Sequence, residues 1–518
     1  MTTLQPDTHH SDPARTPAHP RRWAGLAVLS ASLLLVVMDM TILNVALPAI
    51  TADLAPTSVQ QLWMVDAYPL VLAGLLVTVS ALGDRWGRKR MLLTGFTVFG
   101  VASMLVLLAD SPGDVIAVRA LLGVGGAMIM PSTLSLIRTL FTDPRERAAA
   151  LGVWGAMAAV GGALGPIVGG LLLEYFDWHA AFLFNVPVMV VALVAGLVLL
   201  PEGRSARPPR IDAAATALSV VGMVALVYAI KNGGKDGLAV DVVVGAVLAV
   251  VALTAFVRRC LAATDPMLEV RLFRGRAFTA GVLTALASSI AMAAMLLLGA
   301  QWLQLVLGYS PLQTGLALLP MAVGGIIGSP LAPRVAERIG ARRVLSGGLA
   351  VGGVGFSLLY VAPAPLSYPW LASGLTLVGV GMASLAVASA VIMAGAPAHQ
   401  AGSAAAVEET SYEVGSVLGV AVLGSLAAAV YRSGLPADEL AARGVDAAGA
   451  EAARESLGGA LEVAATSPGG AWLAETASTS FTTSLADLGL AGGVLMLLTS
   501  VVVWWLTPAD LDLADAHH

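Results

Sequence analysis

The sequence has little of what enzymes and soluble domains use. Only 12% of its 518 residues are charged, and its single cysteine, Cys260, excludes an intramolecular disulfide and a cysteine-based metal site. The seven histidines fall in terminal tails and short loops, and no Gly-x-x-x-x-Gly-Lys-Ser/Thr run is present. We therefore expect no metal, no cofactor and no ATP hydrolysis, and no spacing of residues indicates nucleic-acid binding or hydrolytic catalysis.

The chain is rich in long hydrophobic segments. Hydrophobic residues make up 57% of it and the mean hydropathy is +0.84, whereas soluble domains have roughly 45 to 50%. A helix of about 20 residues crosses a bilayer of about 30 Å. Fourteen stretches of that length lie near residues 24–47, 62–82, 91–109, 114–137, 148–173, 181–200, 213–230, 239–257, 278–306, 311–331, 344–362, 370–395, 403–430 and 484–506. The first is too long for a signal peptide, so we predict an all-α membrane protein with fourteen transmembrane helices.

The basic residues predict the orientation of these helices. With the N-terminus inside, the inside segments hold 22 of the 28 Lys and Arg residues, and the last one, Arg119, lies within a span. The outside segments hold only Lys231, Lys235, Arg432, Arg443 and Arg454. Because Lys and Arg accumulate in cytoplasmic loops, we predict a multi-pass protein of the cell membrane with both termini cytoplasmic.

The chain also repeats itself. The loop at residues 83–90, after the second span, aligns with the loop at 336–343, after the tenth, with acid on acid, Gly on Gly and base on base. Eight helices separate the two loops, which predicts two six-helix halves and a two-helix insert, 6+2+6. The predicted parts are a tail (1–22), an N-terminal bundle (23–200), an insert with linkers (201–276), a C-terminal bundle (277–507) that includes a helical hairpin outside the membrane (431–483), and a second tail (508–518).

Several motifs resemble a known family. Residues 83–90 resemble the loop motif of major facilitator transporters, 119–131 their fourth-helix motif, and 161–170 the antiporter motif of their fifth helix. Residues 38–48, 61–68 and 408–413 are similar to the fourteen-helix drug:proton antiporters, most of all to QacA-type quaternary-ammonium exporters. The resemblance covers about residues 23 to 507. It implies the major facilitator fold and proton-coupled efflux of lipophilic organic cations.

Acidic residues inside the spans are the main candidates for function. At mid-bilayer each ionised acid costs roughly 2.5 to 3.5 kcal/mol, so Glu408, Glu409 and Glu413 must be protonated, paired or hydrated. Glu409 and Glu413 share a helix face at i,i+4, and Glu408 is turned about 100° away. Asp39 has no basic residue within reach on its own helix, so we expect it to be protonated or to face water. Asp66 falls near the predicted outer interface, where a carboxylate costs less.

The roles we predict for these residues follow from their chemistry and from the resemblance. Asp39 and Glu413, which match acids of the resembled pumps, and Arg119 are expected to couple protons. The predicted substrate-binding residues combine negative charge with aromatic rings that hold organic cations: Asp66, Glu408, Glu409, Trp63, Tyr68 and Tyr412. The alternatives are a polar face between packed helices for the glutamates and a hydrogen-bond hub for Arg119.

Other residues are candidates for conformational change. Gly161, Gly165 and Gly169 fall every four residues and predict close helix contact, and Pro166 adds a kink that can serve as a fulcrum. Asp84 and Arg88 are expected to form a cytoplasmic latch, either with each other or with a helix end. The alternative for this loop is that its basic residues only keep it inside the cell.

The sequence thus favours an antiporter that needs protons, lipophilic cations and a lipid bilayer, and that works as a monomer. Two other functions stay open: export of a neutral or anionic antibiotic made by the host, and a membrane sensor that has lost transport. Some resembled pumps carry an acid in the tenth span, and residues 320–328 here hold none. We therefore expect monovalent organic cations to be preferred over divalent ones.

Overall fold

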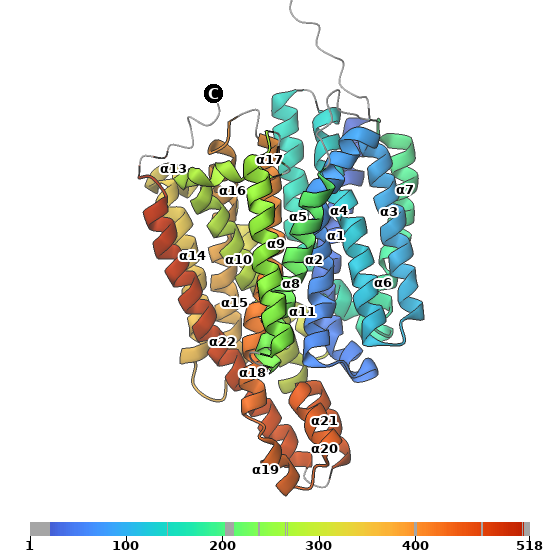
Figure 1. The fold of residues 1–518 in the computed structure, drawn as a ribbon, viewed down its shortest axis with the longest axis vertical. Helices are drawn as coiled ribbons and strands as arrows, with labels where there is room; N and C mark the ends of the chain where they lie inside the picture. Colours follow the sequence, from blue (N-terminus) through green and yellow to red (C-terminus); the bar gives the residue numbers. More distant parts are fainter. Residues whose placement is uncertain are drawn as a thin grey trace, which may run out of the picture.

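The computed structural model describes residues 21–141, 143–202, 212–236, 239–264, 266, 268–397, 401–467, 470–509 and 511. All regular elements in these residues are helices (Figure 1). The first bundle consists of α1 (Arg22–Leu54), α2 (Ser58–Trp86), α3 (Arg88–Leu105), η1 (Val106–Leu108), α4 (Pro112–Leu140), α5 (Pro144–Tyr175), α6 (Ala180–Leu183) and α7 (Asn185–Leu199). Two helices follow, α8 (Ala213–Asp236) and α9 (Val240–Ala262).

The remaining helices form the second bundle and an appended lobe. The bundle consists of η2 (Val270–Arg274), α10 (Arg276–Gln301), η3 (Trp302–Val306), α11 (Pro311–Ala317), α12 (Leu319–Gly328), α13 (Ala332–Ile339), α14 (Ala341–Val361), α15 (Tyr368–Met382), α16 (Ser384–Ala394), α17 (Ala401–Leu418), η5 (Gly419–Gly424), α18 (Ser425–Ser433) and α22 (Gly470–Leu506). The lobe consists of α19 (Ala437–Ala442), α20 (Ala447–Glu455) and α21 (Leu457–Thr466).

Among the described residues, thirteen helical segments are long and apolar enough to cross a membrane, and α5 adds a helix of 32 residues. Capping residues mark the starts of these helices. The Thr57 hydroxyl accepts from the backbone N–H of Gln60, whose side chain accepts from the N–H of Thr57, a capping box that starts α2. Ser111 caps α4, where proline follows in the first helical turn. The predicted fourteen-helix organisation is confirmed.

The repeat predicted from the two loops has a structural basis in one glycine of each. Gly87 separates α2 from α3 with φ +117°, and Gly340 separates α13 from α14 with φ +90°. L-residues with side chains rarely adopt such angles, whereas glycine does so at little cost. Both halves therefore turn at the same motif position, and the 6+2+6 arrangement is confirmed.

The insert lies across the boundary between the halves (Figure 1). In the first bundle α1 packs on α5 and α2 on α4, and in the second α14 packs on α22 and α10 on α17. Helix α8 contacts α2 of the first bundle, α18 of the second and its own partner α9. The insert therefore touches both bundles.

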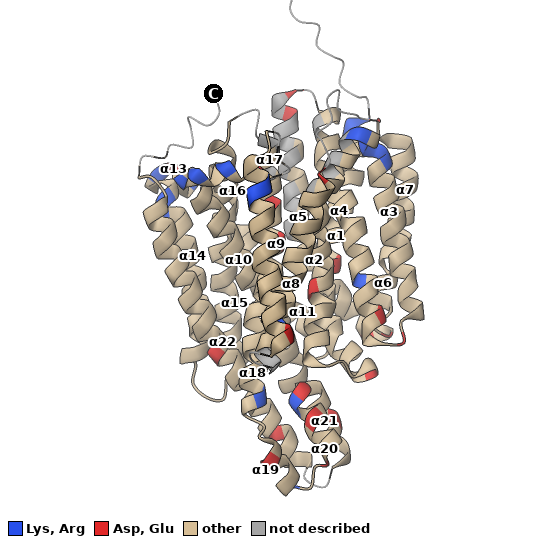
Figure 2. Ribbon diagram, viewed as in Figure 1, with Lys and Arg blue, Asp and Glu red and all other residues tan. Residues whose placement is uncertain are grey.

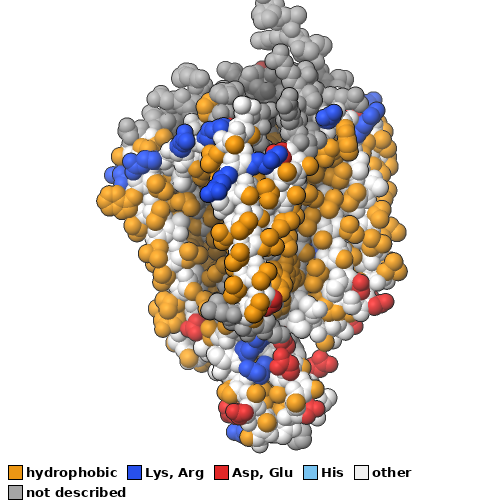
Figure 3. Space-filling view, in the orientation of Figure 1, with side chains coloured by type: hydrophobic (Ala, Val, Ile, Leu, Met, Phe, Trp, Pro, Cys, Tyr) orange, Lys and Arg blue, Asp and Glu red, His pale blue; other side chains and the backbone are white. Residues whose placement is uncertain are grey.

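The surface divides into three zones along the long axis. Lys and Arg gather at one end, near α13 and the start of α3, which we call the basic end (Figure 2). A wide apolar belt follows (Figure 3). Exposed apolar side chains include Val194 of α7 and Val250 of α9. The lobe projects from the other end, the lobe end (Figure 1). This zoning is what a multi-pass membrane protein requires.

Candidate functional site

Asp39 forms a buried ion pair in the first bundle. Its side chain and that of Arg119 from α4 are each 1% exposed, and Arg119 Nη1 lies 2.7 Å from Asp39 Oδ2. The Asn185 amide donates to the other carboxylate oxygen at 2.6 Å. Arg119 Nε donates to the Met64 carbonyl at 3.1 Å, and its guanidinium carbon lies 4.7 Å from the centre of the Tyr68 ring. Asp39 thus has the charged partner that its own helix lacks.

The charge on Asp39 determines whether Arg119 has a charged acceptor. A buried charge pair persists only when the remaining donors and acceptors are satisfied, and here α1, α2, α4 and α7 all contribute. If Asp39 binds a proton, Arg119 loses its charged acceptor while it stays surrounded by protein.

The glutamates of α17 occupy two faces, as their spacing predicts. The Tyr412 hydroxyl donates to Glu408 at 2.8 Å. On the other face, Glu413 is 4% exposed, and its Oε2 has no hydrogen-bond partner among the described residues. Gly415 lies close to the Leu286 carbonyl of α10, so α17 is held tightly in the second bundle. A buried carboxylate without a partner is costly when ionised, and a bound proton or cation relieves that cost.

Asp66 has a charged partner from the insert, and one expectation about the basic residues is wrong. Asp66 is completely buried, and Lys231 Nζ lies 2.8 Å from Asp66 Oδ2. The same ammonium lies 4.4 Å from the centre of the Trp63 ring. Lys231 belongs to α8, so it is not a loop residue, and Arg119 is not the one basic residue within a span. Helix α8 ends at Asp236, six residues past the predicted apolar run of 213–230. The one sign of this in the sequence was that Lys231 directly follows that run.

The glycines of α5 form a close contact with α1. A Cβ at Gly161 would collide with the Leu34 carbonyl, and one at Gly165 would collide with the Thr41 hydroxyl. Gly169, one turn further along α5, is similarly close to Ile42, the residue after Thr41. This seam flanks Asp39 on both sides in the sequence of α1, so a change at Asp39 is positioned to affect how α1 sits on α5.

The halves also meet each other near the lobe end. A Cβ at Gly170 of α5 would collide with the Pro311 carbonyl of α11, and one at Gly315 would collide with the carbonyl of Pro166. The Gln304 side chain donates to the Val45 carbonyl of α1 at 2.9 Å. Pro166 therefore lies where α5 touches the second half of the protein.

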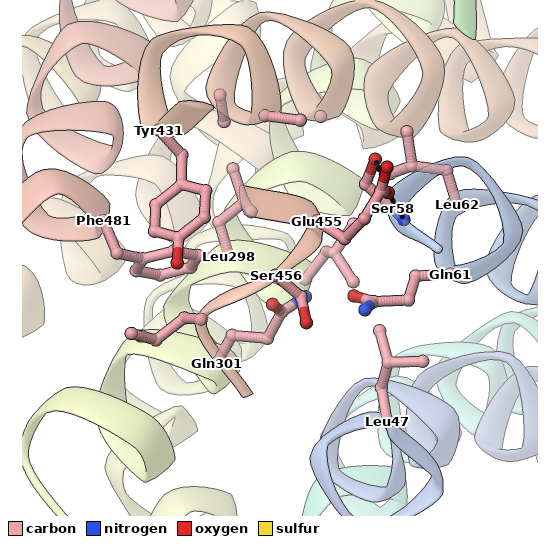
Figure 4. A pocket seen from close by; sticks show the side chains of 15 residues that line it. Leu47, Ser58, Gln61, Leu62, Leu298, Gln301, Tyr431, Glu455, Ser456 and Phe481 are labelled. Carbon is pink, nitrogen blue, oxygen red and sulfur yellow. Dashed lines mark hydrogen bonds between the residues drawn. The ribbon is translucent and has the colours of Figure 1, made fainter. Parts of the chain in front are cut away.

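The lobe adds a further contact between the halves. Glu455 of α20 accepts from the backbone N–H of Ser58 at 2.8 Å and from its hydroxyl at 3.0 Å, at the first residue of α2. Glu455 also lines a cavity of about 50 Å³, whose other polar lining residues include Gln61, Gln301 and Ser456 (Figure 4). The lobe and both bundles therefore enclose this cavity together.

The predicted latch is only partly visible. The side chain of Asp84 lies outside the described residues. Arg88 donates to the Ser135 carbonyl of α4 at 3.4 Å, and Lys89 Nζ donates to the Leu197 carbonyl at 2.8 Å. The first residues of α3 thus contact α4 and α7 at the basic end, and an Asp84–Arg88 latch stays a prediction.

Comparison with known proteins decides the family. The model of the Major Facilitator Superfamily matches residues 29–420. The chain belongs to this superfamily. It is 39% identical over 494 residues to the multidrug efflux pump LfrA of Mycolicibacterium smegmatis, covering 95% of this chain and 97% of that protein. It is 35% identical to the methyl viologen resistance protein SmvA of Salmonella typhimurium (94% and 98% covered).

Another relative is a tetracenomycin C resistance and export protein of Streptomyces glaucescens, 31% identical with 97% and 96% of the two chains covered. Among solved structures, a bacterial homolog of the human lysosomal transporter Spinster, inward-facing and occupied, superposes with a TM-score of 0.67 at 16% identity, covering 95% and 97%. That likeness concerns the fold alone. This facilitator is therefore a multi-pass membrane transporter whose relatives are multidrug and antibiotic efflux pumps.

Proposed function

We propose that this facilitator is a proton-coupled antiporter that exports lipophilic organic cations. The observation that carries the proposal is Glu413, a buried carboxylate with an oxygen that has no partner among the described residues, on the same helix face as Glu409. Such a group gains from binding either a proton or a cation. An exchange of one for the other is the elementary step of antiport.

The energetics of this exchange favour release on protonation. At an effective dielectric near 20, two unit charges 4 Å apart attract by about 4 kcal/mol before desolvation. When the carboxylate takes up a proton, this attraction is lost, and even a third of it changes affinity about tenfold. On the neighbouring face of α17, Tyr412 and Glu408 provide an aromatic ring and a second acid, a combination that suits an organic cation.

Asp39 and Arg119 supply the second proton-dependent element in this proposal. A proton on Asp39 removes the charged acceptor of Arg119 and loosens the junction of α1, α2, α4 and α7. Because the Gly161–Gly165–Gly169 seam joins α1 to α5, and α5 touches α11 at Gly170, the change has a path of packed backbone to the contact between the halves. Protonation would therefore favour a different relative position of the two bundles.

Because Lys and Arg accumulate in cytoplasmic segments, we place the basic end in the cytoplasm and the lobe outside. Both termini are then cytoplasmic. The halves touch near the lobe end, through α5 and α11 and through Glu455 and Ser58. Substrate would then enter from the cytoplasm or inner leaflet. Each bundle supplies one carboxylate site, so a single chain suffices and we propose a monomer.

Cations are supported as the substrate class by the acids and rings above and by one relative, named for resistance to methyl viologen, an organic dication. A second candidate is export of a neutral or anionic antibiotic, which the tetracenomycin C relative supports. The two differ in their need for the acids: a neutral cargo gains nothing from a negative charge at Glu408 or Glu409.

Everted membrane vesicles test the proposal. Ethidium export should start when respiration builds a proton gradient and should collapse on addition of a protonophore, and vesicles with Glu413→Gln protein at equal expression are the matched control. Export that needed ATP and survived the protonophore would refute proton coupling. Export of an uncharged antibiotic together with failure to export ethidium would favour the second candidate.

A further inference from the structure

Lys231 of the insert places its ammonium in a site whose residues suit a cation. Lys231 Nζ is held between the Asp66 carboxylate, at 2.8 Å, and the face of the Trp63 ring, at 4.4 Å from its centre. A carboxylate beside an aromatic face is the arrangement that binds organic ammonium ions. Asp66 and Trp63 both come from α2, whereas the ammonium comes from α8.

The cluster lies beside two small cavities near the lobe end. Lys231 lines a small cavity between α2, α8 and α18, together with Ser58, Leu62 and Arg432. Ser58 and Leu62 also line the cavity beneath the lobe, where both are visible (Figure 4). The cluster therefore lies next to the cavity that both bundles and the lobe enclose.

The charge balance of the cluster excludes a further cation. Lys231 and Asp66 are each fully buried, and together they are neutral. Their 2.8 Å separation is that of an ion pair, although the angles do not meet hydrogen-bond geometry. A buried carboxylate left without its partner is strongly unfavourable, so removal of the ammonium would leave a site that gains from any cation able to reach it.

We propose that Lys231 is a specificity-determining residue that occupies the Asp66–Trp63 site as a tethered cation and denies it to the second charge of organic dications. The inference rests on the proposed export of cations and deepens it. It also gives the two-helix insert a role: α8 sets the net charge that α2 presents to cargo. Monocations need one acidic site, which α17 supplies.

Binding to the purified protein tests this inference, with ethidium as the monocation and methyl viologen as the dication. Four proteins are compared: wild type, Lys231→Met, Lys231→Arg as the charge-retaining control, and Lys231→Met with Asp66→Asn, which removes both charges. We expect Lys231→Met to bind methyl viologen at least about tenfold more tightly than the double variant. Lys231→Arg, which keeps the charge, should bind both ligands within about threefold of wild type.

Two outcomes would overturn the inference. One is equal methyl viologen affinity in Lys231→Met and in the double variant, because Asp66 would then not bind the freed charge. The other is methyl viologen binding that is present in wild type and lost in the double variant, because Asp66 would then already bind dications. This comparison uses only proteins in which the cluster is neutral, so it does not depend on the folding of Lys231→Met. These experiments measure binding, whereas the vesicle experiment measures export. A failure of export would therefore refute the proposed function without deciding the role of Lys231.

Discussion

Replacing Asp39 by asparagine should abolish proton-driven export and leave a protein that is folded but less stable. The carboxylate accepts from Arg119 on one oxygen and from Asn185 on the other. Asparagine keeps one acceptor and turns the other position into a donor, so one of the two partners loses its hydrogen bond. Arg119 also loses its counter-charge while it stays buried.

Removing one partner of a buried ion pair typically costs about 3 to 5 kcal/mol. Because asparagine still accepts one hydrogen bond, we expect the lower end, about 3 kcal/mol. Cys260 offers a direct assay: it is the one cysteine of the chain and is 2% exposed, so a thiol-reactive fluorophore reports its exposure on heating. The variant should expose Cys260 at a lower temperature than wild type and show cation export that no longer responds to an imposed pH gradient.

Asp53→Asn is the matched control. It makes the same chemical change in the same helix, at an exposed residue whose carboxylate accepts from the Trp178 indole at 2.8 Å. It should export cations at close to the wild-type rate. Gradient-driven export at the wild-type rate by the Asp39→Asn protein would refute the reasoning, and so would an equal loss in both variants.

Three more predictions concern the acids and the seam. Glu413→Gln should stop counterflow of protons against ethidium and keep the protein folded, because it removes a titratable group at constant volume; normal proton release in liposomes would contradict this. Gly165→Ala should slow turnover more than binding, since its Cβ collides with Thr41, whereas Gly162→Ala meets its nearest atom, on Val37, at 3.9 Å and should be harmless; equal rates in the two variants would show that the close contact is unimportant. Gly325→Asp, in the stretch without acids, should raise resistance to dications relative to ethidium in a growth assay, and strong dication resistance without it would speak against the monovalent preference.

The architecture follows from the sequence because it depends on one-dimensional properties. Apolar runs of membrane length, the basic residues between them and a loop motif that recurs eight helices later are enough to predict fourteen helices in a 6+2+6 order. The acids at Asp39 and Glu413 are also evident from the sequence, because each lies within an apolar run. The glycine face of α5 is evident from the four-residue spacing of its glycines.

The partners of the buried charges were decided by the tertiary structure. Asp39 meets Arg119 from a helix 80 residues away, and Asp66 meets Lys231 from the insert. No periodicity indicates such pairs, because they depend on which helix faces turn toward each other once the bundles assemble. Lys231 shows most clearly what the sequence does not determine. Hydropathy places it at the edge of a span, and only the packing of α8 against α2 and α18 determines that its ammonium is buried and paired.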